Sequence, residues 1–287
     1  MQRRLRLRGR DRHLAAAATV VALAVALVGC AGKSSSGGQG QGSGGGSGAK
    51  KFAPLTLNPN QVVAASAVKT LAARSAKMAM TLQVTGASAT PLTVSAEGAF
   101  DFTGRRGTML MHLPNIGDIQ AVFDKGVVYE KLGAALHGAT GGGKPWIKID
   151  LTKMLGTNAG LGVPQGGNDP SQGLALLFGA AGVTKVGSAS IRGVPTTHYH
   201  GTMDLTKAAQ QLSPQYRNLY ESTLKALGST VKSLPADLWI DDLGRLRRIS
   251  YAMKLAGATT KTTVDYFSFG TPVSVQIPPA DQVTTLG

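Results

Sequence analysis

The chain has 287 residues, of which 43% are hydrophobic and only 5% aromatic, and it carries a formal net charge of +15. Its one cysteine, Cys30, excludes an internal disulfide. The sequence contains no DNA- or RNA-binding motif to accompany the positive charge, so we do not expect nucleic acid as a partner.

The N-terminus, residues 1–29, has the pattern of a secretory signal: six arginines precede an apolar stretch over residues 14–28. The stretch is short and alanine-rich for a membrane span, which needs about 20 apolar residues. It ends in Leu27-Val28-Gly29-Cys30, which resembles a bacterial lipobox. The resemblance implies acylation of Cys30, cleavage before it, and attachment to the outer face of the cytoplasmic membrane, because two acyl chains anchor a protein stably. The alternative is an uncleaved anchor with an incidental cysteine.

Residues 30–50 are rich in Gly, Ser and Gln, which predicts a disordered tether, and residues 51–287 then form one domain. Without residues 1–29, the chain keeps 24 basic and 14 acidic residues, a net charge of +10. This charge favours anionic surfaces such as phospholipid head groups. The alternative is charge spread over the surface for solubility.

A near-match to a phosphate-binding loop lies at Gly138–Lys144, with Gly143 and Lys144 in the expected places. A nucleotide-binding loop needs Ser or Thr after the lysine and a helix after that. Pro145 follows instead, and the alternation from Trp146 to Ile149 predicts a strand. We therefore expect a glycine-rich loop that enters a sheet, and no nucleotide.

The first predicted elements are a helix over Pro59–Ala76, with Asn58 as its N-cap, and then a strand meander. Side chains of alternating polarity mark the strands around residues 78–84, 94–102, 109–113, 119–123 and 127–129. Short connections between consecutive strands predict antiparallel pairing.

The second half opens with an apolar helix predicted to begin at Asp169 and to end at Gly179 or Gly182. Strands follow at residues 183–192 and 196–203, two helical patterns at 205–227, a hairpin at 238–255, and a strand at 260–269. These elements predict an α+β fold: a large curved antiparallel sheet, or half-barrel, whose concave face is covered by helices.

The order of these features resembles the LppX/LprG-type envelope lipoproteins, which have the LolA-like half-barrel fold. The matching segments are the lipobox and tether, "PWIKID", "GVPTTHYHGTMDL", "LPADLWIDDLGRLRRI" and the terminal "FSFGTPVSVQIPPADQV". The resemblance implies a hydrophobic cavity that binds an acylated lipid or lipoglycan, which the protein carries or presents in the cell envelope.

Methionine suits surfaces that must accept variable apolar shapes, because it is flexible and polarizable. We expect the cavity to be lined by Met78, Met80, Leu82, Val94, Phe100, Phe102, Met109, Met111, Leu113, Leu177 and Phe178. The alternative for each is an ordinary place in a packed core.

Catalytic and metal-binding patterns are weak. His198 and His200 share a strand face, which is compatible with metal binding, but the sequence offers no third ligand. Asp241 and Asp242 fit a hairpin turn better than an acid/base pair. We expect that the protein is not an enzyme and binds no cofactor. We also expect a monomer, with an envelope transport protein as a candidate partner. The competing function is an envelope sensor or adaptor that binds a protein in place of a lipid.

Overall fold

A computed structural model describes residues 57–86, 90–114, 116–131, 133, 143–150, 172–211, 217, 232–255 and 257–286. The predicted signal, Cys30 and the predicted tether lie outside these residues. So do all of residues 138–142 and most of the second helical pattern.

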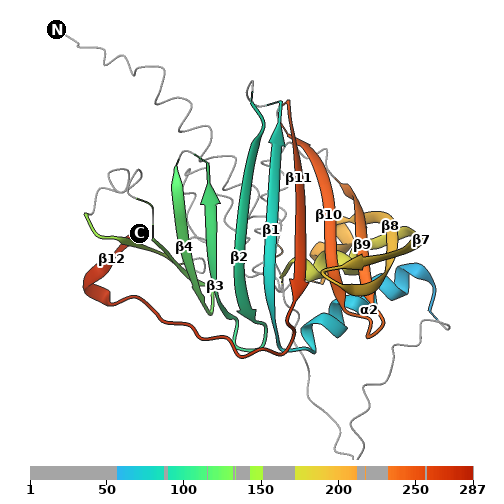
Figure 1. The fold of residues 1–287 in the computed structure, drawn as a ribbon, viewed down its shortest axis with the longest axis horizontal. Helices are drawn as coiled ribbons and strands as arrows, with labels where there is room; N and C mark the ends of the chain where they lie inside the picture. The colour runs from blue at the N-terminus through green and yellow to red at the C-terminus, as the bar shows by residue number, and fades with distance from the viewer. Residues whose placement is uncertain are drawn as a thin grey trace, which may run out of the picture.

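The described strands form one sheet in the order β12-β6-β5-β4-β3-β2-β1-β11-β10-β9-β8-β7, which is open because β12 and β7 are its two edges (Figure 1). All neighbouring pairs are antiparallel except β12 with β6. The bounds are β1 Ser75–Thr85, β2 Leu92–Asp101, β3 Arg106–Leu113, β4 Gly117–Asp124, β5 Val127–Lys131, β6 Trp146–Asp150, β7 Ala180–Ile191, β8 Val194–Asp204, β9 Ser233–Asp241, β10 Leu246–Leu255, β11 Ala258–Phe267 and β12 Val283–Leu286. The predicted antiparallel meander is therefore confirmed, while β12 was not predicted.

The first described helix, α2 (Pro59–Leu71), begins as the sequence predicted. The Asn58 side chain accepts a hydrogen bond from the Gln61 amide, and the Gln61 side chain accepts one from the Asn58 amide, both at 3.0 Å. This reciprocal pair satisfies two amides that have no partner inside the helix. The predicted end at Ala76 is wrong, because Arg74 adopts a left-handed conformation and β1 starts at Ser75.

Side chains near the two ends of α2 attach it to the sheet. The Asn60 side chain accepts a hydrogen bond from the Val183 amide of β7 at 2.8 Å, and the Thr70 hydroxyl accepts one from the Leu246 amide of β10 at 2.9 Å. Between them, Val63 and Ala67 are fully buried. Complete burial of a valine side chain contributes roughly 1.5–3 kcal/mol to the stability of the fold.

Two more short helices lie on the same side of the sheet. The 3-10 helix η3 (Gln172–Gly179) stands where the sequence predicted an α-helix, and α4 (Leu205–Gln210) follows β8. Within the described residues, α2, η3 and α4 contact one another or strands β7 to β10 (Figure 1). These three helices therefore gather at one end of the sheet, and helical cover over its whole concave face stays a prediction.

A long segment, residues 268–282, connects β11 to β12. Figure 1 shows it running beneath the lower ends of the central strands to the opposite edge of the sheet. The segment ends with the 3-10 helix η4 (Ala280–Gln282), after which β12 pairs with β6 in the parallel direction. Of the described helices, none combines the length and the apolar character that crossing a bilayer requires.

Candidate functional site

One face of the sheet, called here the inner face, carries the apolar side chains and faces the helices. Its residues on β1 are Ala76, Met78, Met80, Leu82 and Val84, none more than 6% exposed. They belong to the same buried cluster as the core side chains of α2 and η3. The alternation found in the sequence therefore identified the inward side chains of β1 correctly.

Cross-strand pairing arranges the inner face into rows that alternate methionine with very small residues. One row runs Met78, Gly98, Met109, Ala121 across β1 to β4, and the next runs Met80, Ala96, Met111, Ile119. Directly opposite residues on one face lie about 4.5–5.5 Å apart between their Cβ atoms. In each row a residue with little or no side chain, Gly98 or Ala96, lies between two methionines, whose side chains are flexible and polarizable.

Gly98 has a second role in shaping this face. A Cβ atom at this position would collide with the carbonyl oxygen of Thr108 on β3, although the backbone of Gly98 is extended. The Phe100 ring likewise occupies the space above Gly107, its partner on β3. Glycines within strands permit close backbone approach and sharp coiling of a sheet.

The structure brings ten of the eleven predicted lining residues to this core. Met78, Met80, Leu82, Val94, Phe100, Phe102, Met111, Leu113 and Leu177 are buried, and Met109 is half-buried against them. Phe178 differs, because 37% of it is exposed at the surface. Their role in lining a cavity stays a prediction.

Polar groups interrupt the inner face at places that the sequence did not reveal. Glu130 of β5 pairs with Ala121 and Ile147, so it continues the row of Met78 and Met109. Burial raises the pKa of the Glu130 carboxyl. A carboxyl in such a position favours its neutral form, in which it can donate a hydrogen bond.

Tyr251 of β10 pairs with Thr262 of β11, whose row continues to Leu82 and Val94. Burial raises the pKa of the Tyr251 hydroxyl to about 12, and the neighbouring Thr262 side chain lowers it somewhat. The hydroxyl nevertheless makes no hydrogen bond of good geometry with the described residues. A buried hydroxyl without a partner costs about 1–3 kcal/mol, which a ligand atom or a water molecule would recover.

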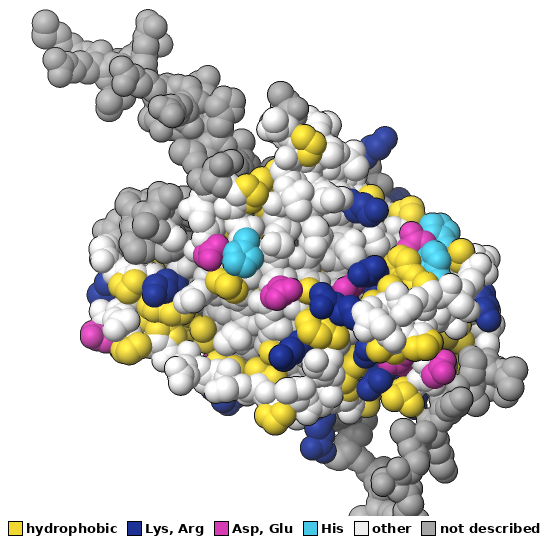
Figure 2. All heavy atoms as spheres, viewed as in Figure 1, with side chains coloured by type: hydrophobic (Ala, Val, Ile, Leu, Met, Phe, Trp, Pro, Cys, Tyr) yellow, Lys and Arg dark blue, Asp and Glu magenta, His cyan; other side chains and the backbone are white. Residues whose placement is uncertain are grey.

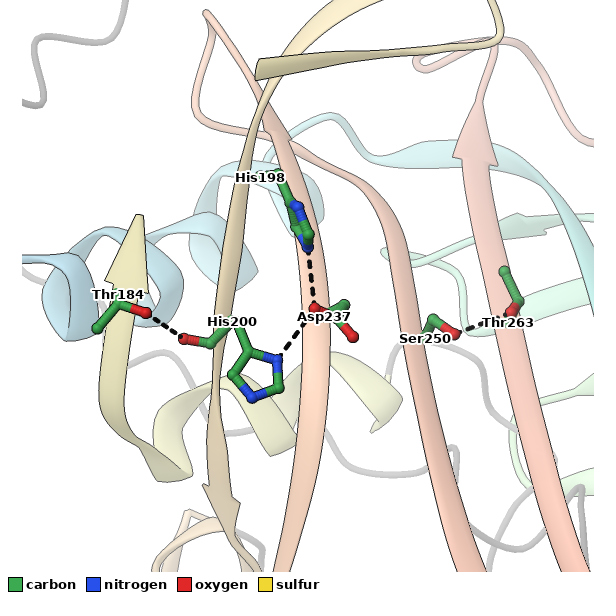
Figure 3. A network of polar contacts seen from close by, with 6 residues as sticks. All are labelled: Thr184, His198, His200, Asp237, Ser250 and Thr263. Carbon is green, nitrogen blue, oxygen red and sulfur yellow. Dashed lines mark hydrogen bonds and ion pairs between the residues drawn. The ribbon is translucent and has the colours of Figure 1, made fainter. Parts of the chain in front are cut away.

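The opposite, outer face holds the histidine pair (Figure 3). His198 and His200 project to one side of β8, as predicted, and each places a ring nitrogen near Oδ1 of Asp237 on β9, at 2.9 and 3.0 Å. The His198 ring also stacks on Trp239, with centroids 4.4 Å apart. Burial alone would raise the pKa of Asp237, but the two histidines lower it overall. The described residues include no group of three His, Cys, Asp or Glu side chains arranged to hold a metal.

Two other sequence interpretations are confirmed. Asp241 accepts hydrogen bonds from the amides of Leu243 and Arg245, so it stabilises the β9–β10 turn. Lys144 leads into strand β6, and its Nζ donates to the carbonyl oxygen of Val283 at 3.1 Å. No helix follows Lys144, so the arrangement required of a nucleotide-binding loop is not present here.

Among known proteins, no family model matches this chain. A protein of Streptomyces griseus named only as an uncharacterized 31.2 kDa protein is 31% identical over 193 residues, which cover 64% of this chain and 62% of that protein. A candidate lipoprotein of Streptomyces coelicolor is 30% identical over 144 residues, or 48% of this chain and 41% of that protein. The match thus spans less than two thirds of either relative.

Several solved structures are similar to the chain. Lipoprotein LppX of Mycobacterium tuberculosis has a TM-score of 0.45 at 16% identity, covering 75% of this chain and 99% of LppX. LprF of Mycobacterium bovis has a TM-score of 0.47 at 17% identity, covering 80% of this chain and 99% of LprF. A LolA superfamily protein of Nitrosomonas europaea has a TM-score of 0.32 at 8% identity, covering 79% of this chain and 97% of that protein. The structures found thus include the LppX and LolA types that the sequence motifs resemble.

Proposed function

We propose that this protein is a membrane-anchored envelope lipoprotein that binds an acylated lipid or glycolipid against the inner face of its sheet. The proposal extends the resemblance found in the sequence, where the lipobox at Cys30 and the following tether supply the anchor. In this arrangement the domain stands at the outer face of the cytoplasmic membrane and carries or presents the lipid.

The observation that supports the proposal best is the row structure of the inner face. Met78 and Met109 alternate with Gly98 and Ala121, and Met80 and Met111 flank Ala96. A core built for tight packing uses branched and aromatic side chains with well-defined rotamers and contains little methionine. Methionine beside glycine or alanine instead favours a surface that acyl chains of varied shape can enter.

The test is to express residues 50–287 without the anchor, extract the purified protein with organic solvent, and identify lipids by mass spectrometry. Reproducible recovery of one class of acyl lipid supports a carrier, and the residues that line the occupied cavity would then be found by a structure with that lipid. Absence of lipid, together with a filled interior in an experimental structure, would sink the proposal. That outcome would favour a sensor or adaptor that binds protein.

A further inference from the structure

One end of the sheet, where β1 begins and β11 ends, gathers basic residues. We call six of them the basic rim: Arg74, Arg105, Lys125, Arg192, Arg245 and Arg248. They come from the turns between α2 and β1, β2 and β3, β4 and β5, β7 and β8, and β9 and β10, with Arg248 at the adjoining start of β10. Figure 2 shows dark-blue side chains toward the lower middle of the face where these strands end.

Four of the six occupy backbone positions that basic residues seldom adopt. Arg74, Arg105, Lys125 and Arg192 have φ angles between 49 and 68°. Lys125-Gly126 and Arg192-Gly193 form two-residue hairpin turns with both φ angles positive, where Asn-Gly or Asp-Gly is the favoured pair. Strained backbone of this kind is concentrated at functional sites in proteins.

Backbone hydrogen bonds join three of these turns to one another and to the segment after β11. The Lys125 amide donates to the Arg105 carbonyl at 2.9 Å, and the Phe102 amide donates to the Arg74 carbonyl at 2.8 Å. The Gly270 amide, just after β11, donates to the Ser75 carbonyl at 2.9 Å. Since neighbouring strands lie about 4.8 Å apart, the rim extends roughly 35 Å along the end of the sheet.

The acidic residues at this end do not neutralise the rim. Asp265 lies between two guanidinium groups, those of Arg192 and Arg248, with Nε–Oδ distances of 3.0 and 2.6 Å. Asp241 likewise faces both Arg245 and Arg247. Each cluster therefore keeps an excess positive charge. Of the other described carboxylates at this end, Asp124 pairs with Arg106, Asp101 accepts the amides of its own turn, Asp150 ends β6 opposite Val127, and Asp242 is exposed.

The segment after β11 adds apolar surface at the same end. Residues 268–280 contain no acidic residue, and Ile277 in this segment is 44% exposed. Figure 1 shows the segment passing beneath the lower ends of β1 to β4. Basic residues beside exposed apolar ones are the combination by which proteins bind at a lipid interface.

We propose that the basic rim docks the domain on an anionic phospholipid surface, end-on, through the end of the sheet where β1 begins. The length of the rim argues against a pocket for one small anion and for an extended, shallow partner. The orientation of the docked domain is set by the position of the basic turns. It does not depend on whether the inner face binds lipid.

The experiment uses the full chain with Cys30→Ser, so that no acyl group is attached. Flotation is measured with vesicles of phosphatidylcholine alone and of phosphatidylcholine with phosphatidylglycerol. Residues 1–29 contribute six further arginines that also attract phosphatidylglycerol, but they are the same in every variant. The difference between the rim variant and its matched control therefore reports the rim. The rim variant carries Arg74→Glu and Lys125→Glu, and the matched control carries Lys254→Glu and Lys261→Glu, two exposed lysines elsewhere on β10 and β11.

Each basic residue at an anionic surface strengthens binding about fivefold. The rim variant should therefore lose at least about 25-fold of the phosphatidylglycerol-dependent affinity, and the control variant should keep most of it. Equal losses in the two variants would mean that only net charge matters, and no preference of the parent chain for phosphatidylglycerol would point to a different partner. Either result overturns the proposal. If the rim variant unfolds, Arg74→Gln with Lys125→Gln makes the same comparison with a smaller loss.

Discussion

Met80 and Met111 lie on either side of Ala96 in one cross-strand row of the inner face, on β1 and β3 respectively. Both are 6% exposed. They lie far apart in the sequence, yet in this row they flank Ala96, its smallest side chain. This relationship gives the proposed lipid-binding face its most direct test.

Replacing Met80 or Met111 with Trp should lower the lipid that co-purifies with the protein, because the indole fills the space beside Ala96. If that space is adaptable, the free energy of unfolding should change by less than about 1 kcal/mol. Leu110→Trp, next to Met111 but on the outer face, is the control and should leave lipid content unchanged. A loss of about 1–3 kcal/mol with unchanged lipid would instead identify both methionines as plain packed core.

Gly98→Ala should destabilise the protein by about 1–3 kcal/mol, because the added methyl group meets the Thr108 carbonyl oxygen and β2 must move away from β3. Gly187→Ala on β7 provides the comparison, since a Cβ there has open space around it. This second substitution should be neutral or slightly stabilising. Urea denaturation of the two variants measures the difference, and equal stability would contradict the close approach of β2 and β3.

Glu130→Gln should stabilise the protein at neutral pH, because it removes a carboxyl whose ionisation is disfavoured by burial. The pKa of Glu130 is raised in the folded state, so the wild-type protein binds this proton more tightly when folded. Its stability should therefore fall as pH rises above the ordinary carboxyl value of 4.5, and the variant should lack this component.

The control for that measurement is Glu97→Gln, which alters an exposed carboxyl on the outer side of β2. It should leave the pH dependence of unfolding as it is in the wild type. Should both variants change the pH profile equally, Glu130 would not be the group responsible.

Asp265→Asn should cost about 1–3 kcal/mol at pH 7, because Arg192 and Arg248 lose their shared carboxylate. Burial alone would raise the pKa of Asp265, but the hydrogen bonds from Arg248 and Arg192 lower it overall. A depressed carboxyl pKa stabilises the fold above its ordinary value of 3.8, and this stabilisation disappears as pH falls through the folded value.

The difference between wild type and Asp265→Asn should consequently shrink as the pH falls below the ordinary carboxyl value of 3.8. Asp242→Asn, at an exposed turn position, should show no such trend. A difference that stays constant down to about pH 2 would show that the carboxylate charge contributes nothing.

Local features of the fold could be predicted from the sequence, because short-range interactions decide them. Asn58 and Gln61 are three residues apart, so their capping exchange needs only the first turn of α2. The alternation of polar and apolar residues along β1 predicted which of its side chains are buried, because successive side chains in a strand point to opposite faces. The β9–β10 turn was equally readable, because Asp241 bonds amides only two and four residues away.

Features that depend on strand register came only from the tertiary structure. The partner of the histidine pair, Asp237, lies on another strand and has no local signal in the sequence. Glu130 enters the methionine row through the pairing of β5 with β4 and β6, and a shift of one residue would turn it outward.

The sequence by itself determined which residues are apolar and where most of the described strands lie, though not β12. The tertiary structure decided that Met80 and Met111 flank Ala96, and that turns as distant as Arg74 and Arg192 come to one end of the sheet. The physical reason is that β1 is paired with β11 from the far end of the chain, so the sheet joins its two halves by contacts that no local pattern encodes.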